Sequence, residues 1–287
     1  MTRGILAIVL LWFSVNVLSE DPTRNDTTVN VKADVCFNNS LSFRLNDLHS
    51  PLNIYRKSLS DLGQIFASPF QWNKSQFLKA GIILATGVTI YKLDEPIYTF
   101  INRNKTPFTE FTSKYLLEPQ GNYATFALLA GMAGYGLAFH KEKPVTAAVL
   151  ATESYLITGV FTLIPKTLAG RVRPYHTDPL NPNVWNGPLG GRSFWSGHTA
   201  TVFGVASVIA EMYKDHKAIP IIAYTSATLT GLSRIHDGKH WPSDVFFGAV
   251  VGTVIGKMIV KSYHSANLSF VPVFTPQSQG FQLSYTF

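Results

Sequence analysis

The chain from residue 78 to residue 260 is a succession of apolar stretches of helical length, separated by short polar connections. We expect helices over Leu78–Leu93, a more polar Pro96–Leu117, Tyr123–Phe139, Val145–Ile164, Thr199–Tyr213, Ala218–Ser233 and Val245–Val260. Only 14% of the 287 residues are charged, against about 25% in an ordinary soluble domain. The pattern predicts an all-α multi-helix bundle that is either heavily buried or embedded in a membrane.

Membrane insertion rests mainly on one of these stretches. Gly121–Phe139 has 19 residues without a formal charge, close to the ~20 that cross a bilayer. The other stretches are shorter or interrupted, for example by Glu153. Composition therefore indicates membrane association without fixing the number of spans.

The N-terminal residues have the pattern of an export signal. Thr2 and Arg3 give a short positive start, and Gly4–Leu18 is an apolar core. We expect residues 1–19 to be removed, so that the mature chain begins near Glu20 outside the cytoplasm. Since Val17 fits the small-residue cleavage pattern imperfectly, an uncleaved anchor is the alternative. The single cysteine, Cys36, excludes an intrachain disulfide.

Two segments flank the expected helical domain, residues 77–264. The leader, residues 20–76, is polar and without period up to about residue 50, which predicts an extended or poorly ordered chain. Between Leu52 and Trp72 an amphipathic helix ending before Pro69 is expected, on the helical spacing of Leu59, Leu62, Ile65 and Phe66. In residues 265–287, apolar residues alternate with polar ones after the turn Pro276–Gly280, which predicts a small β-hairpin appendage.

The stretch Ser233–Asp244 is the most polar part of this apolar region. Its twelve residues hold two histidines, two aspartates, an arginine and a lysine. Pro242 suits the first turn of a helix, so we expect a helix to begin at Trp241 or Pro242. Asp244 can then accept the N–H of one ring nitrogen of His240, leaving the other nitrogen free to attack an electrophile. A helix N-terminus also attracts an anion, so the stretch predicts a histidine nucleophile facing a phosphate.

Two simpler interpretations compete with that one. A histidine followed four residues later by an aspartate is often only a hydrogen bond at a helix start. His236 and His240 also have the i, i+4 spacing of a zinc pair. Gly238 between them and Pro242 after them disfavour a continuous helix, so the metal site is the weaker of these ideas.

Further cationic and phosphate-binding groups are expected at the same end of the bundle. If the last four helices run up and down in turn, the loops Arg171–Gly197 and Ile235–His240 share one end. Lys166 and Arg173 are seven residues apart, so both can lie on one face of a helix that Pro174 ends. In Ser196-Gly197-His198, the serine is a good N-cap and the glycine admits close approach of a ligand. Cations, a helix N-terminus and two histidines together suit metal-independent phosphoryl transfer.

The order and spacing of these groups resemble a known three-part signature. Lys166-x6-Arg173-Pro174, then Ser196-Gly197-His198, then Ser233-Arg234-x5-His240-x3-Asp244 is similar to the type 2 phosphatidic acid phosphatase family. Its superfamily also contains vanadium-dependent haloperoxidases and bacterial acid phosphatases. The resemblance covers residues 166–244, within helices from about 120 to 262. One departure is Trp195, where the family usually has proline, and it puts substrate preference in doubt.

The resemblance implies a role for each matching residue. His240 would be the nucleophile that forms a phosphohistidine, oriented by Asp244, and His198 would protonate the leaving oxygen and then activate water. The phosphate oxygens would be held by Lys166, Arg173, Arg234, Ser196 and the Gly197 N–H. No cofactor or metal is implied, and vanadate would inhibit. Six nearby polar residues are off the pattern and are expected to form a solvated rim: Arg171, Arg192, His176, His236, Asp237 and Lys239.

The leading functional hypothesis is a metal-independent phosphatase acting on a lipid phosphate or lipid pyrophosphate at a membrane. The alternatives are a soluble exported acid phosphatase of broad range, a vanadate haloperoxidase and an inactive envelope scaffold. We expect a lipid or small-molecule phosphate as partner, and no nucleic acid. The excess of lysines at the opposite end of the bundle places the site on the periplasmic or exterior side by the positive-inside rule. An odd number of spans would conflict with this, since the tail would then end in the cytoplasm.

Overall fold

A computed structural model describes residues 68–265, Gly63 and five strand segments, with side chains for residues 70–264. Between residues 70 and 264 the structure contains helices, turns and loops and no strand, which confirms the all-α prediction for this part of the chain. The predicted amphipathic helix of the leader and nearly all of the predicted export signal lie outside the described residues.

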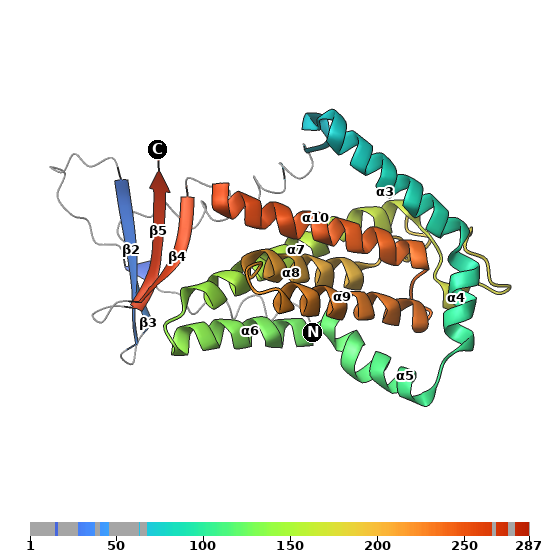
Figure 1. The fold of residues 1–287 in the computed structure, drawn as a ribbon, viewed down its shortest axis with the longest axis horizontal. Helices are drawn as coiled ribbons and strands as arrows, with labels where there is room; N and C mark the ends of the chain where they lie inside the picture. Colours follow the sequence, from blue (N-terminus) through green and yellow to red (C-terminus); the bar gives the residue numbers. More distant parts are fainter. Residues whose placement is uncertain are drawn as a thin grey trace.

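Short connections join the helices of this part, except for the longer loop between η4 and α8 (Figure 1). They are η1 (Ser68–Gln71), α3 (Lys74–Lys92), α4 (Asp94–Arg103), α5 (Pro107–Thr112), η2 (Ser113–Leu117), η3 (Glu118–Gly121), α6 (Tyr123–Ala138), α7 (Glu142–Ala169), η4 (Pro174–His176), α8 (Gly197–Met212), α9 (Ala218–His236) and α10 (Pro242–Ser265).

Two sequence predictions about helix ends are corrected. The single helix expected over Pro96–Leu117 is divided, because Thr106 caps a new helix, α5, that has Pro107 in its first turn. Helix α7 runs through Pro165 and ends at Ala169, where Gly170 adopts the left-handed conformation with a φ of 65°. Pro174 therefore does not end this helix, and Arg173 lies beyond it in extended backbone.

Helix α8 is the centre of the bundle and packs against α7, α9 and α10 (Figure 1). Its closest approach is to α10, through glycines spaced four residues apart. A Cβ on Gly248 would lie 2.6 Å from the Ser196 carbonyl oxygen, and one on Gly252 would lie 2.0 Å from that of Ala200. Because only glycine permits this contact, the stripe fixes the start of α8 against the start of α10.

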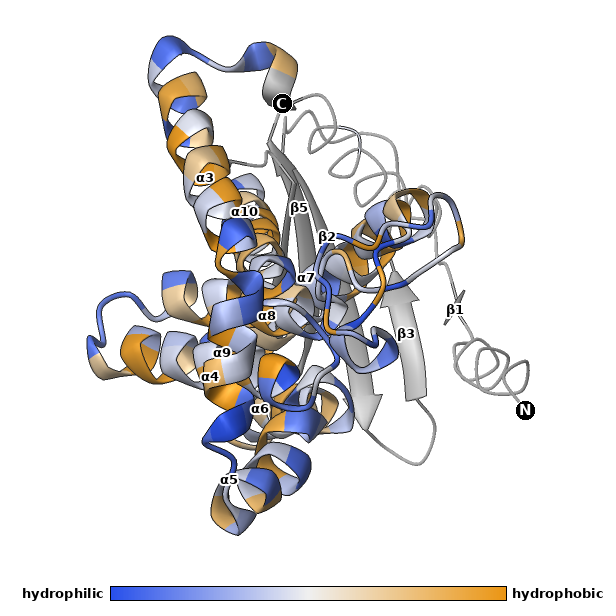
Figure 2. Ribbon diagram, turned by 90° about the vertical axis from the view of Figure 1, so that its right-hand side faces the viewer, coloured by the Kyte–Doolittle hydropathy of each residue, from blue (hydrophilic) through white to orange (hydrophobic). Residues whose placement is uncertain are grey.

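The bundle has an apolar interior and an outer surface that is also apolar in many places. The main buried cluster joins α6, α7, α8 and α10 through Leu129, Leu150, Ala151, Ile157, Val205, Val208, Ile255, Ile259 and Val260. Outward-facing side chains such as Ile82, Leu163 and Ile222 are at least 58% exposed, and hydrophobic residues recur along α3 and α10 in Figure 2. Two described helices, Glu142–Ala169 and Pro242–His264, are long and apolar enough to cross a membrane.

The terminal segments form a five-stranded sheet in the order β1-β3-β2-β5-β4. Its strands are β1 (Val15–Asn16), β2 (Thr28–Phe37), β3 (Leu41–Leu45), β4 (Leu268–Phe274) and β5 (Gln279–Thr286). Strand β5 pairs with β4 on one side and with β2 of the leader on the other, with Val31 opposite Leu283. An isolated C-terminal hairpin is therefore not supported, and the leader contains the extended strands β2 and β3.

Candidate active site

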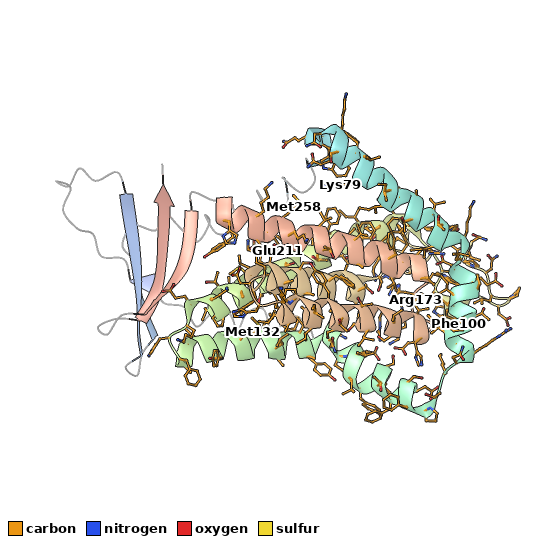
Figure 3. All side chains as sticks on the ribbon, viewed as in Figure 1. Lys79, Phe100, Met132, Arg173, Glu211 and Met258 are labelled. Atoms are coloured by element: carbon orange, nitrogen blue, oxygen red, sulfur yellow. The ribbon has the colours of Figure 1, made fainter. Side chains whose placement is uncertain are left out.

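The three parts of the sequence signature meet at one end of the bundle, as the expected up-and-down order of the helices requires. The Gly238 carbonyl accepts the Tyr175 N–H at 3.3 Å, and the Asp244 carbonyl accepts the Ser196 N–H at 3.0 Å. At the opposite end, Lys143 in the first turn of α7 lies 4.0 Å from Asp215 in the connection between α8 and α9. Figure 3 shows Arg173 at the first end, beside α4, and Glu211 toward the other.

The side chain of His240 is almost completely buried and held in one tautomer. Its Nδ1 lies 2.8 Å from the Ser193 carbonyl oxygen. A carbonyl can only accept, so Nδ1 carries the proton and Nε2 carries the free lone pair. Burial, together with the charges of Lys166 and Arg173, lowers the pKa of His240 well below its ordinary value of 6.5. His240 is thus a neutral imidazole at physiological pH.

Asp244 supports His240 indirectly, which corrects the predicted hydrogen bond between them. Its carboxylate is 3.9 Å from His240 Nδ1, too far for a hydrogen bond. Instead it accepts the Ser193 hydroxyl at 2.5 Å and the Trp241 N–H at 3.0 Å. Asp244 therefore fixes the residue whose carbonyl holds the histidine.

Behind Asp244 lies a fully buried ionic cluster that the sequence did not predict. Arg171 donates to Asp244 at 2.7 Å and to Asp94 at 2.6 Å, and all three side chains are 0% exposed. Asp94 also accepts the Ser243 N–H at 2.8 Å, and the Arg171 guanidinium lies over the Trp241 ring. The expectation that Arg171 belongs to a solvated rim is wrong, because the backbone turn at Gly170 directs it inward.

Ser196 and Gly197 begin helix α8 as predicted. The Ser196 Oγ accepts the Thr199 N–H at 3.4 Å and the Thr199 hydroxyl at 2.8 Å, and its residue is fully buried. A Cβ on Gly197 would lie 3.4 Å from Lys166 Nζ. The ammonium of α7 thus lies directly beside the N-terminus of α8, where both attract an anion.

His198 faces the short helices before α6. Its Nε2 lies 3.2 Å from the Asn122 amide nitrogen, and Gly121 packs so closely on its ring that a Cβ would be 2.2 Å away. Burial, with the charges of Arg234 and Lys166, lowers the pKa of His198 to about 4. Without substrate, His198 is neutral at physiological pH.

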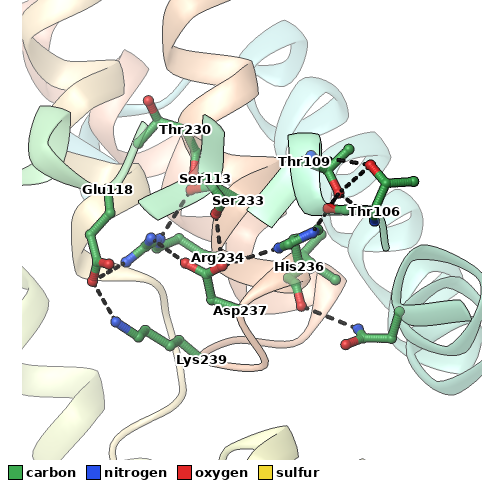
Figure 4. A network of polar contacts seen from close by, with 12 residues as sticks. Thr106, Thr109, Ser113, Glu118, Thr230, Ser233, Arg234, His236, Asp237 and Lys239 are labelled. Carbon is green, nitrogen blue, oxygen red and sulfur yellow. Dashed lines mark hydrogen bonds and ion pairs between the residues drawn. The ribbon is translucent and has the colours of Figure 1, made fainter. Parts of the chain in front are cut away.

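Arg234 is the centre of a second ionic network, drawn in Figure 4. Its guanidinium donates to Asp237 at 2.7 Å and to Glu118 at 3.3 Å. Lys239 pairs with the same carboxylate of Glu118. His236 contacts Asp237 at 3.1 Å and the Thr109 hydroxyl at 3.2 Å. This arrangement holds the end of α9 against α5 and η3.

Four of the six predicted rim residues therefore have structural partners. Arg171 belongs to the buried cluster, and Asp237, His236 and Lys239 take part in the second network. His176 and Arg192 are exposed. The sequence prediction also missed Glu118 and Asp94. No local sequence signal marks Asp94, because an acidic residue in the first turn of a helix is common.

The cations near His240 fall into two groups. Arg171, Arg234 and Lys239 are ion-paired. In contrast, no carboxylate among the described residues lies within 4.0 Å of Lys166, Arg173 or Arg192. The Arg173 Nε is buried and has no hydrogen-bond acceptor in this part of the chain. An unpaired set of this kind is suited to binding an anion.

Comparisons with known proteins agree with the signature. Residues 147–268 match the PAP2 superfamily. A lipid A 1-phosphatase of Porphyromonas gingivalis is 42% identical over 67 residues, 23% of this chain and 15% of that protein. A lipid phosphate phosphatase 1 of Arabidopsis thaliana is 29% identical over 138 residues, 38% of this chain and 42% of that protein. An undecaprenyl-diphosphatase of Sulfolobus acidocaldarius is 28% identical over 153 residues, 49% of this chain and 73% of that protein.

Two solved structures are also similar. LpxE of Aquifex aeolicus has a TM-score of 0.46 at 26% identity, covering 59% of this chain and 95% of that one. A transmembrane PAP2-type phosphatidylglycerolphosphate phosphatase of Bacillus subtilis has a TM-score of 0.45 at 18% identity, covering 75% and 96%. Residues 147–268 of this chain are thus similar to the PAP2 superfamily, and the signature groups within them lie together at one end of the bundle.

Proposed function

We propose that this protein is a phosphatase that removes a phosphoryl group from a lipid phosphate or lipid pyrophosphate through a phosphohistidine intermediate. The observation that carries the proposal is the hydrogen bond from His240 Nδ1 to the Ser193 carbonyl. It leaves the Nε2 lone pair of a neutral, buried imidazole next to unpaired cations and the N-terminus of α8. A nucleophile in that state needs no base to activate it.

The reaction has two steps. In the first, His240 Nε2 forms a bond to phosphorus, the bond from phosphorus to the leaving oxygen breaks, and that oxygen takes a proton from His198. In the second, water attacks the phosphorus while His198 accepts a proton, and the bond between nitrogen and phosphorus breaks. Lys166, Arg173 and the first N–H groups of α8 stabilise the charge that develops on the phosphate oxygens.

Phosphate binding favours the protonated form of His198, which takes its proton from solvent. The pKa of His198 is about 4 in the free site. An anionic phosphate favours the charged imidazolium, so this pKa rises when substrate binds. Arg234 is already paired with Asp237 and Glu118. Its positive charge is therefore fully available to the phosphate only when Glu118 is displaced.

We propose that no metal takes part, because the unpaired cations and the helix N-terminus supply the charge that a divalent ion would otherwise bring. Vanadate should bind in the same place as a trigonal-bipyramidal mimic and inhibit. The same anion site could hold vanadate as the cofactor of a haloperoxidase, but no observation favours that reaction over hydrolysis.

A lipid substrate is favoured over a soluble one by the outer surface of the bundle. Exposed leucine, isoleucine and phenylalanine side chains cover several helices, and two described helices are long enough to span a membrane. Three relatives carry names that specify lipid A, lipid phosphate and undecaprenyl diphosphate substrates. These features also disfavour a soluble exported phosphatase.

We further propose that the site faces the periplasm or the exterior. The opposite end of the bundle carries Lys141, Lys143, Lys214, Lys217, Lys257 and Lys261. At the site end, Arg171 is buried in an ion pair, which leaves fewer positive groups there to face the cytoplasm. Labelling of single cysteines at positions 214 and 192, in a Cys36→Ser background, with an impermeant thiol reagent would test this: position 192 should react in intact cells and position 214 only after lysis.

The activity is tested on the purified chain in neutral detergent with a lipid phosphomonoester, excess chelator and ¹⁸O-labelled water. We expect inorganic phosphate carrying one solvent oxygen from the wild type and none from His240→Ala. Activity that disappears in chelator and returns with zinc or magnesium would contradict metal independence. Equal activity of His240→Ala and wild type would contradict the proposal as a whole.

A further inference from the structure

A cavity of about 480 Å³ opens next to the phosphate site, on the loop between α7 and α8. Its polar walls are Arg173, Arg192, His176, Tyr175 and Asn186, and its apolar wall includes Leu189. No acidic residue lines it. We propose that this cavity binds a second phosphate, so that the substrate is a lipid diphosphate whose terminal phosphate is at His240 and whose inner phosphate is held by Arg192. This inference rests on the proposed function.

Arg173 is the wall that the two binding places share. Its positive charge acts on His240, and its side chain also lines the cavity. The two phosphates of a diphosphate are joined by one oxygen, so only adjacent subsites with a common wall can hold both. The arginine's Nη1 donates to the Tyr175 hydroxyl at 3.0 Å, whereas its buried Nε has no acceptor in the described part of the chain.

Arg192 has a position and a charge that the reaction at a single phosphate does not require. It is an exposed cation without a carboxylate partner among residues 70–264, and its charge acts on Lys166 together with that of Arg173. Three mutually repelling cations are unfavourable without an anion between them. One phosphate at His240 uses Lys166 and Arg173, and a second phosphate gives Arg192 its partner.

The remaining walls suit the part of the substrate beyond the diphosphate. Leu189 is 79% exposed and Tyr175 is 51% exposed, and both lie on the cavity. An apolar rim next to a cationic floor fits an amphiphile, since the lipid chain can leave over Leu189 while the phosphates stay inside. A sugar phosphate or a nucleotide has no apolar chain that could cover this rim, so the rim would not contribute to its binding.

In this arrangement the leaving group is a lipid monophosphate. His240 Nε2 forms its bond to the terminal phosphorus, the bond from that phosphorus to the bridging oxygen breaks, and the bridging oxygen stays on the inner phosphate. The Arg192 guanidinium stabilises the negative charge that develops there, because charge-assisted hydrogen bonds to phosphate are strong. Arg192 is thereby a residue that determines specificity for diphosphates.

The test compares farnesyl diphosphate with farnesyl monophosphate in neutral detergent, for wild type, Arg192→Ala and the control Arg103→Ala. Arg103 is an exposed arginine on α4 that does not line the cavity. A charged hydrogen bond contributes about 1.5–3 kcal/mol, so Arg192→Ala should lower the ratio of kcat/KM for diphosphate over monophosphate by about 10-fold or more. Arg103→Ala should leave the ratio unchanged.

Binding of non-hydrolysable analogues, measured by calorimetry, gives a second readout that does not need turnover. Methylene diphosphonate should bind wild type more tightly than methylphosphonate, and Arg192→Ala should remove most of that difference. If Arg192→Ala lowers activity on both substrates equally, or leaves the difference in binding intact, the second subsite does not exist. If neither substrate is hydrolysed by wild type while the diphosphonate still binds through Arg192, the proposed function fails and the subsite remains.

Discussion

The two ionic networks of the site differ in burial, and the difference separates a fixed half of the site from an exchangeable half. Behind His240, the side chains of Asp94, Arg171 and Asp244 are all 0% exposed. Beside His198, those of Glu118 and Lys239 are 30% and 37% exposed. A buried ionic cluster has no alternative partners, so it holds one geometry, whereas a half-exposed pair can exchange its partner for water or a substrate.

The two halves would then have different tasks in the proposed reaction. The buried network holds His240, the proposed nucleophile, in place through Ser193. The more exposed network pairs Arg234 and Lys239 with Glu118, and in the proposed reaction a phosphate competes with Glu118 for them. Mutations in the first network should therefore affect folding and kcat together, and mutations in the second should affect substrate binding.

The largest effect is expected from Arg171→Ala. The substitution leaves Asp94 and Asp244 buried without their cation, and breaking a buried ion pair in this way costs about 3–5 kcal/mol. We expect an inactive protein with a strongly lowered Tm, measured by thermal unfolding in detergent. Arg171→Lys should recover part of the Tm but little activity, because an ammonium lacks the two-sided fork of a guanidinium. Arg103→Ala is the control, and an Arg171→Ala variant as stable as that control would refute the fixed half.

Sequence patterns were sufficient for the parts of this site that depend on local rules. The N-cap Ser196 and the start of α10 at Pro242 follow from residue preferences at helix ends. The grouping of Lys166, Arg173 and the two histidines follows from the order of the helices. The sequence could not place Arg171. Its inward direction depends on the turn at Gly170, and its partner Asp94 lies 77 residues earlier in the chain, so both depend on the tertiary structure.

The ends of the chain were predicted less well for a related reason. Alternating residues in 281–287 correctly suggested a strand, but the pairing of β5 with β2 depends on the leader, which is more than two hundred residues away in sequence. The polar composition of the leader gave no sign of a strand. Long-range strand pairing has no local sequence signal of the kind that marks a helix cap.

The next largest effect concerns His198. If it protonates the leaving oxygen, His198→Ala should lose about 10²–10⁴-fold in kcat on an alkyl phosphate and much less on p-nitrophenyl phosphate, whose leaving group needs no proton. The measurement is kcat on both substrates at one pH. An equal loss on both would assign His198 to phosphate binding instead.

A smaller effect is expected from Glu118→Gln, which tests the exchangeable half. The hydrogen bond from Lys239 holds the pKa of Glu118 below its ordinary value, so the carboxylate stays charged and competes with phosphate at physiological pH. Removing its charge should lower KM several-fold with little change in Tm. Glu110→Gln, an exposed glutamate on α5, is the control. A fall in kcat with KM unchanged would mean that Glu118 orients Arg234 for catalysis rather than masking it.

The smallest expected effect is a change in the number of protons that the protein binds when vanadate binds. Since the pKa of His198 is about 4 in the free site and an anion raises it, vanadate binding at pH 6 should take up protons. Calorimetry in two buffers of different ionisation enthalpy measures this number. The expected result is net uptake in wild type and a smaller uptake in His198→Ala. Proton release, or the same uptake in both proteins, would contradict the account of His198.

The central claim is that His240 is the nucleophile, and rapid quench of the phosphoenzyme tests it most directly. Enzyme mixed with ³²P-labelled substrate and stopped within milliseconds should carry a label that is stable in base and lost in acid, as a phosphohistidine is. Peptide mapping should place that label on His240, and His240→Ala should carry none. Labelled enzyme that persists in His240→Ala, or a label that maps to another residue, would show that the geometry at Ser193 and His240 does not mark the nucleophile.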